Sequence, residues 1–184
     1  MSLKHTTYGI ALVVSLAACG DARDVDLGAG AYEAAEGLSL RDDQIGCYAA
    51  SELERTAAEL ARLTLHRAHS DAVRGYARAA LQAHEALYAG LKQVGAAEHL
   101  PVSRTMSLTG EKMWGALYNH GGKRFEADFF GLQAKLQAET LQQLHGLRAQ
   151  ASNVALQTWI DGAIVQWQAD RITLDAAQKA WRAE

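Results

Sequence analysis

The stretch from Ser70 to Ala97 constrains the fold more than any other part of the chain, because its apolar residues repeat with the period of a helix. They recur every three or four positions, at Val73, Tyr76, Ala77, Ala80, Leu81, Leu87, Tyr88 and Leu91. This spacing is typical of an amphipathic helix with one buried face. Ser70 is a favourable N-cap, and Gly95 followed by Pro101 predicts the end of the helix. His84 lies within the apolar stripe, so the sequence predicts a histidine inside the core.

The same period extends over the rest of the chain after residue 38. The whole sequence has a single proline, and residues that favour helices, such as Ala, Leu, Gln, Glu and Arg, are abundant. Besides the first stretch, we expect helices at Leu40 to Ala68 with Ser39 as N-cap, Leu108 to Asn119, Phe125 to Ala149 and Asn153 to Trp181. Four long amphipathic helices and one short one predict an all-α domain over residues 39–184. Its expected architecture is an antiparallel four-helix bundle with one short extra helix in the second connection.

The N-terminus carries a different signal. Lys4 precedes an apolar run from Ile10 to Ala18, which is too short to span a bilayer as a helix. The run ends in Leu16-Ala17-Ala18-Cys19, which resembles the lipobox of bacterial lipoproteins. We therefore expect residues 1–18 to be a signal peptide and Cys19 to carry lipid, the alternative being an ordinary secretory signal beside a chance cysteine. Gly20, rather than Asp, follows the cysteine, and by the same resemblance this favours the periplasmic face of the outer membrane.

The mature chain would then be a tethered, mildly acidic domain. Residues 19–38 are mainly Gly, Ala and Asp, and a flexible tether of this length reaches roughly 20–25 Å. Removing residues 1–18 takes away one lysine and no acid, leaving 17 Lys and Arg against 21 Asp and Glu, a net charge of −4. This charge argues against a nucleic-acid partner. Cys47 is the only other cysteine, so an intrachain disulfide is excluded once Cys19 is lipidated.

Several motifs together resemble one known family. They are the run from Ala61 to Tyr76, ARLTLHRAHSDAVRGY, with Ala77 after it and His84 seven residues further on, Asp42-Asp43-Gln44-Ile45, Pro101, and Phe125-Glu126 with Phe129. In this order and spacing they resemble the bacterial family of unknown function numbered 4142, over roughly residues 39–180. The resemblance implies a ferritin-like four-helix bundle in a protein that is commonly exported or lipid-anchored. The family has no established biochemical function.

The chain departs from the family pattern at its polar positions. By spacing, the family's glutamate on the first helix falls at Ala57, and its Asp-His pair falls at Ala83 and His84. Its histidines on the third long helix and on the last helix fall at Gln137 and Asp170. His84 is therefore the only one of three histidines that remains. Glu54 and Glu59, on the first helix, are then the two candidates to replace the missing carboxylate.

The residues themselves predict a polar cluster in the core. Asp170 lies three residues after Trp167 and four before Leu174, so its carboxylate points to the same interior as His84. Burying both groups costs several kcal/mol unless they are paired. We therefore expect His84 and Asp170 to be in contact, with Gln137 and either Tyr48 or Tyr76 completing the cluster.

Two interpretations of this cluster remain open. In the first, it is a satisfied polar network that fixes helix register and needs no cofactor. In the second, His84, Asp170, Gln137 and Glu59 form a metal or small-ligand site.

Other patterns carry less chemistry. His66 and His69 close a helix, where positive charge is favoured, and no acidic residue stands one turn away. The Glu-x-x-His motif of di-iron bundles is absent, as are a Gly-x-Ser-x-Gly elbow, a phosphate loop and Cys-x-x-Cys. The four tryptophans, Trp114, Trp159, Trp167 and Trp181, are expected in the core or facing a partner. The sequence therefore favours a non-enzymatic protein that binds a protein or an envelope component, with a degenerate metal or small-ligand binder as the alternative.

Overall fold

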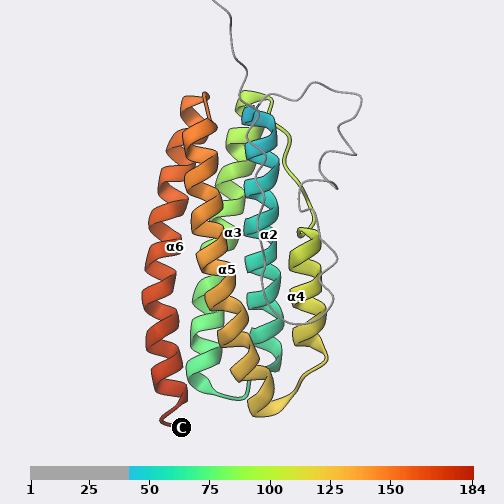
Figure 1. The fold of residues 1–184 in the computed structure, drawn as a ribbon, viewed down its shortest axis with the longest axis vertical. Coiled ribbons are helices and arrows are strands. Elements are labelled where there is room, and N and C mark those ends of the chain that lie inside the picture. Colours follow the sequence, from blue (N-terminus) through green and yellow to red (C-terminus); the bar gives the residue numbers. More distant parts are fainter. Residues whose placement is uncertain (1–41) are drawn as a thin grey trace, which may run out of the picture.

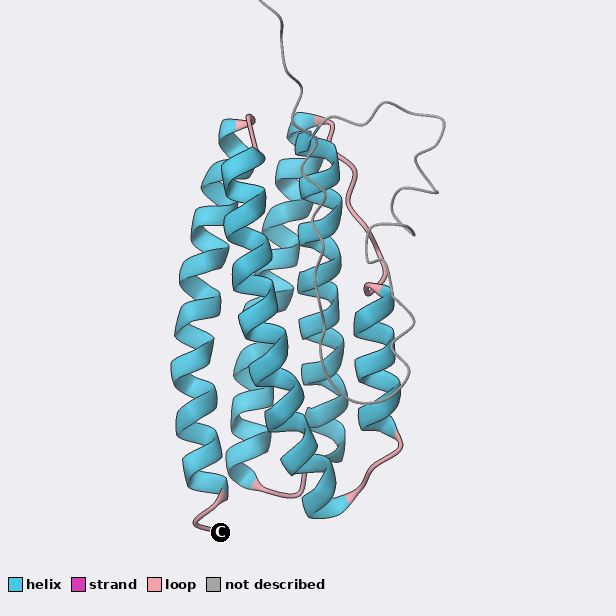
Figure 2. Cartoon of the chain, in the orientation of Figure 1, coloured by secondary structure: helices cyan, strands magenta, loops and turns pink. Residues whose placement is uncertain are grey.

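A computed structural model describes residues 42–184, and all regular secondary structure in this part of the chain is helical. Its five helices are α2 (Asp42–Arg67), α3 (Asp71–Glu98), α4 (Leu108–Tyr118), α5 (Gly122–Gln150) and α6 (Val154–Trp181). Figure 1 shows four long helices side by side and the short α4 along one side of them. Figure 2 shows no strand in the described range. The predicted all-α bundle with one short extra helix is confirmed.

The connections make all neighbouring long helices antiparallel. Two tight turns join α2 to α3 and α5 to α6, whereas the path from α3 to α5 returns along the bundle through α4 (Figure 1). The long helices pack in a ring in the order α2, α3, α6, α5. Helices α2 and α6 therefore lie on one diagonal of the bundle, and α3 and α5 lie on the other. One long crossover between two helical hairpins is a recognised topology of ferritin-like bundles.

Helix α4 covers the outer side of α2, which is therefore buried on several faces. The close approach is possible because Gly110 has no side chain: a Cβ atom at this position would lie 2.3 Å from Thr56 Oγ1. Ser107 caps α4 by accepting a hydrogen bond from the Gly110 amide at 3.0 Å. The wide burial of α2 explains why its inner face is rich in small residues, including Ala50, Ala57 and Ala61.

Helix α3 begins as predicted and ends differently. The Ser70 hydroxyl accepts a hydrogen bond from the Val73 amide at 3.3 Å, which confirms the N-cap. The helix continues through Gly95 to Glu98, and His99 ends it in the left-handed conformation at φ 56°. Gly95 instead permits close packing, because a Cβ atom there would lie 2.6 Å from Val102 Cγ2. The glycine thus lets the following loop fold back on the helix.

Other expected boundaries shift by a few residues or lie outside residues 42–184. Helix α5 begins at Gly122, three residues before the predicted start, because this glycine adopts φ +57° directly after Gly121. The signal peptide 1–18, Cys19 with the tether 19–38, and the Ser39 cap all fall outside the described residues. Within the described residues, no helix is long and apolar enough to cross a membrane.

Candidate functional site

The centre of the bundle holds one histidine between two carboxylates. His84 on α3 has no exposed surface. Its Nδ1 lies 2.8 Å from Glu54 Oε2 on α2, at hydrogen-bond distance. Its Nε2 lies 3.0 Å from Asp170 Oδ2 on α6. These two atoms form an ion pair, but the N–H is not aligned with the oxygen well enough to make a hydrogen bond. The contact expected between His84 and Asp170 is therefore present, with Glu54 on the opposite edge of the ring.

Each carboxylate also accepts a hydrogen bond from another side chain of α6. Trp167 Nε1 donates to Glu54 Oε1 at 2.8 Å, and Gln166 Nε2 donates to Asp170 Oδ1 at 2.9 Å. The indole of Trp167 also packs on the imidazole of His84, with ring centroids 4.4 Å apart and planes inclined by 47°. Trp167 thus contacts both His84 and Glu54 and closes the cluster from the α6 side.

The two carboxylates decide the charge of His84. Burial alone lowers the pKa of this histidine. Hydrogen bonding and charge attraction from Asp170 and Glu54 outweigh burial, and they raise the pKa of His84 from 6.5 to about 9. The imidazole is therefore protonated at neutral pH and acts as a buried cation between two acceptors.

A second group of polar side chains extends the cluster toward α5. Gln137 Nε2 donates to the Tyr76 hydroxyl oxygen at 3.2 Å. Burial, followed by the nearby charge of Asp170, raises the pKa of Tyr76 well above its usual range. Gln137 Oε1 and Thr140 Oγ1 are buried, and neither has a hydrogen-bond partner within residues 42–184. Of the two tyrosines that the sequence left open, Tyr76 is the one beside the cluster. Within the described range, no hydrogen bond joins the Tyr48 side chain to the cluster.

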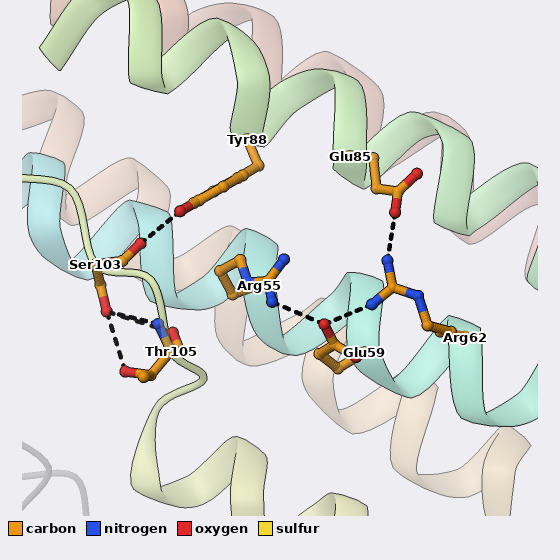
Figure 3. A network of polar contacts seen from close by, with 7 residues as sticks. All are labelled: Arg55, Glu59, Arg62, Glu85, Tyr88, Ser103 and Thr105. Atoms are coloured by element: carbon orange, nitrogen blue, oxygen red, sulfur yellow. Dashed lines mark hydrogen bonds and ion pairs between the residues drawn. The ribbon is translucent and has the colours of Figure 1, made fainter. Parts of the chain in front are cut away.

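The structure places Glu59 outside this cluster. Its carboxylate accepts hydrogen bonds from Arg55 Nη2 at 2.8 Å and Arg62 Nη1 at 2.5 Å, and its side chain is 22% exposed. Figure 3 shows Glu59 between these two arginines, with Arg62 also reaching Glu85 on α3. The assignment of Glu59 to the cluster is corrected to Glu54, one of the two glutamates that sequence spacing left open.

The spacing of small residues along α2 distinguishes the two glutamates. Cys47, Ala50, Glu54, Ala57 and Ala61 follow one another at intervals of three and four, and all are buried. A glutamate inside such a seam points into the bundle. Glu59 is out of phase with this seam by half a turn. The spacing of residues in the sequence does not predict the contact between Trp167 and Glu54. This contact joins two diagonal helices, and packing of the whole bundle determines their relative height.

The cluster has the composition of a metal site without its geometry. Among residues 42–184, no group of three or more His, Cys, Asp or Glu side chains is arranged to hold a metal ion. Both ring nitrogens of His84 already face carboxylate oxygens, whereas a metal-binding imidazole must offer one nitrogen lone pair to the ion. Gln137 is hydrogen-bonded to Tyr76, and within residues 42–184 no hydrogen bond or ion pair joins either residue to His84.

A third buried carboxylate, Glu126, joins three helices at the end of the bundle where α3 and α5 begin and α6 ends. Its Oε1 accepts hydrogen bonds from the amides of His69 and Ser70, each at 2.7 Å, just before α3. Its Oε2 accepts from Trp181 Nε1 at 2.8 Å. Burial raises the pKa of Glu126, but these hydrogen bonds outweigh burial and hold the pKa below its usual range. His69 therefore belongs to a helix cap rather than to a pair with His66.

The described surface also has a shallow groove, separate from the cluster. It has a volume of about 220 Å³ and lies between the last turns of α3 and the loop that follows. Tyr88 is fixed at its edge by donating a hydrogen bond to the Ser103 carbonyl at 2.8 Å (Figure 3). Lys92 and Arg104 make the groove basic, and its other lining residues are Gly95, Ala96, Leu100 and Val102.

Comparisons with known proteins identify a family and no activity. No curated protein and no solved structure matches the chain. A family model described as a domain of unknown function, DUF4142, matches residues 28–175. This match covers most of the chain, including the cluster and all five described helices up to the last turns of α6. The chain therefore belongs to the DUF4142 family.

Proposed function

We propose that this chain is a lipid-anchored helical-bundle protein on the periplasmic face of the outer membrane. It acts there by binding a protein or another envelope component through its helix faces, and not by catalysis. The proposed anchor is lipid on Cys19, supported by the sequence Leu16-Ala17-Ala18-Cys19 after a short apolar run.

The sealed state of the central cluster supports a structural role for its polar groups. His84 and Glu54 are fully buried and Asp170 is 5% exposed, so a substrate has no direct access to any of the three. Both nitrogens of His84 are engaged by carboxylates, which leaves no lone pair for a base or a ligand. Such a network ties α2, α3 and α6 in one register, and the residues that contact partners are then those on the surface.

Replacing Cys19 tests the anchor. We expect Cys19→Ser protein to leave the membrane fraction, because lipid on this thiol would be its attachment. The matched control is Cys47→Ser, which removes a buried thiol on α2 and should remain with the membranes. Recovery of Cys19→Ser protein from carbonate-washed membranes in the same amount as the parent protein would overturn the anchor.

A metal or small-ligand site is the second candidate function. The observation that favours it is that Gln137 Oε1 and Thr140 Oγ1, on α5, are buried oxygen atoms with neither a hydrogen bond nor an ion pair in the described range. Buried polar atoms normally have a partner. Elemental analysis of protein purified without a histidine tag tests this alternative. A stoichiometric metal that is lost in both Asp170→Asn and Gln137→Leu variants would favour it over the structural role.

A further inference from the structure

The groove along the last turns of α3, which we call the α3 groove, has two exposed cations in its lining, Lys92 and Arg104. The Lys92 ammonium lies 5.9 Å from the centre of the Tyr88 ring. Neither cation forms an ion pair with a carboxylate within residues 42–184. Leu100 and Val102 add an apolar surface beside them. The groove therefore suits a segment that combines acidic and apolar side chains.

The size of the α3 groove favours part of a polypeptide over a small molecule. Its volume is about 220 Å³, whereas small-molecule pockets commonly have roughly 300–1,000 Å³ and enclose most of their ligand. A shallow groove of this size has room for one or two side chains of a segment that lies across it.

The chain enters the bundle beside this groove. Helix α2 begins at Asp42, and Cys47 follows five residues later. A Cβ atom on Gly95, which lines the groove, would lie 3.9 Å from Cys47 Sγ. Five residues of helix rise about 8 Å, and four residues of chain span at most about 14 Å. A segment that ends at residue 38 is therefore within reach of the groove.

Residues 28–38, with the sequence GAGAYEAAEGL, have the composition that the groove suits. They contain Glu33 and Glu36 and no Lys or Arg, and Tyr32 and Leu38 are their larger apolar residues. The family model matches from residue 28, fourteen residues before α2 begins. Linkers that make no contacts normally vary among relatives. The inclusion of this segment in the family's common sequence therefore favours a contact with the domain.

We propose that residues 28–38 bind along the α3 groove of their own chain, with Glu33 and Glu36 facing Lys92 and Arg104. Each exposed ion pair is weak by itself. Covalent attachment, however, holds a short segment near its site at an effective concentration in the millimolar range. A few weak contacts are therefore sufficient for binding within one chain.

This contact determines how far the domain stands from an anchor at Cys19. The tether expected at residues 19–38 is shortened to residues 19–27, which reach roughly 15–18 Å rather than roughly 20–25 Å. The contact goes beyond the proposed function and does not depend on the lipid, because the segment and the groove belong to the same chain.

Intrachain disulfide trapping tests the contact. In the chain carrying Cys19→Ser, Ala35→Cys is combined either with Ala96→Cys, in the groove, or with Ala149→Cys, on α5. Positions 96 and 149 are both exposed, and the native Cys47 thiol is fully buried.

Position 149 is a matched control because it also lies near the start of α2. The amide of Ser152, three residues further on, donates a hydrogen bond to Asp43 Oδ1 at 2.8 Å. A segment without a preferred site would therefore reach positions 96 and 149 at similar rates.

Under mild oxidation we expect the disulfide between positions 35 and 96 to form at least about ten-fold faster than that between positions 35 and 149. Lys92→Glu with Arg104→Glu should lower the first rate to the second. Adding Glu33→Lys with Glu36→Lys should restore it, because the charges are then exchanged.

A second control keeps the change in net charge and moves it away from the groove. Arg171→Glu with Lys179→Glu alters two exposed cations of α6 and should leave the preference for position 96 unchanged. Equal rates at positions 96 and 149 in the parent background would overturn the proposal. So would a preference that survives charge reversal in the groove, or one that is lost equally in the α6 control. Covalent dimers in place of the intrachain disulfide would show that the segment binds another copy, and would also overturn it.

Discussion

The charge of the buried cluster makes folding stability depend on pH in a specific window. The two carboxylates hold the pKa of folded His84 at about 9, against 6.5 for the ordinary side chain. Between these values the folded state binds this proton more tightly than the unfolded state does, so the resulting stabilisation is fully present below pH 6.5. It is lost as pH rises through about 9. The difference in pKa corresponds to about 3 kcal/mol at 1.36 kcal/mol per unit.

Urea unfolding followed by circular dichroism measures this effect. The free energy of unfolding should fall by about 3 kcal/mol between a series below pH 6.5 and a series near pH 9. His84→Gln removes the titrating group and should flatten this part of the profile. The matched control is His145→Gln on the exposed face of α5, which should keep the parent slope.

Two outcomes would refute the reasoning. A parent protein whose free energy of unfolding is constant over this window has no protonated imidazole between its carboxylates. A slope that persists in His84→Gln originates from other groups. In either case, the assignment of a positive charge to His84 fails even if the contacts are correct.

Three further predictions use matched pairs of variants or a single buried thiol. Glu54→Gln should lower the free energy of unfolding by roughly 3 kcal/mol in urea titrations, because it breaks a buried charge network. Glu59→Gln disrupts only half-buried surface pairs, so it should lower the free energy of unfolding by less than about 1 kcal/mol. Equal losses would contradict the placement of the two glutamates. Gly110→Ala should destabilise by about 1–3 kcal/mol in thermal unfolding, because the new Cβ would lie 2.3 Å from Thr56 Oγ1. Gly115→Ala on the same helix has open space and should stabilise by up to about 1 kcal/mol. Burial raises the pKa of Cys47 from 9.0 to about 11. Because the thiol ionises at lower pH in the unfolded chain than in the folded one, the free energy of unfolding should fall as pH rises above 9.0. A series of unfolding measurements at alkaline pH should show a smaller fall for Cys47→Ala.

The helices and the central pair could be predicted from sequence because both depend on local periodicity. His84 and Asp170 each occupy a stripe position on a long helix, and antiparallel packing of such stripes brings buried polar groups together. The ends of the helices depend on single backbone conformations. His99 at φ 56° and Gly122 at φ +57° determine where α3 ends and α5 begins, and periodicity carries no information about either angle.

The sequence could not identify Glu54 as the third residue of the cluster, because this choice depends on how α2 is rotated about its own axis. Glu54 and Glu59 are five residues apart and so point to opposite sides of a helix, and a stripe assigned one residue out of register exchanges their roles. The short helix α4 adds to this ambiguity, because it buries an additional face of α2 that an isolated four-helix bundle would leave exposed. Packing of α4 through Gly110 on Thr56 is a tertiary contact with no local signal.

The contacts made by α6 inside the bundle also determine what it presents outside. Trp167 and Trp181 are fourteen residues apart, close to four helical turns, so their indoles leave the helix on the same side. Each donates a hydrogen bond to a buried glutamate, Glu54 or Glu126, and these two bonds fix the rotation of α6 at two heights. Val165 and Ile172, on the other side of the helix, are then held facing outward. A polar network in the core thereby determines which residues of α6 are exposed at the surface of the bundle.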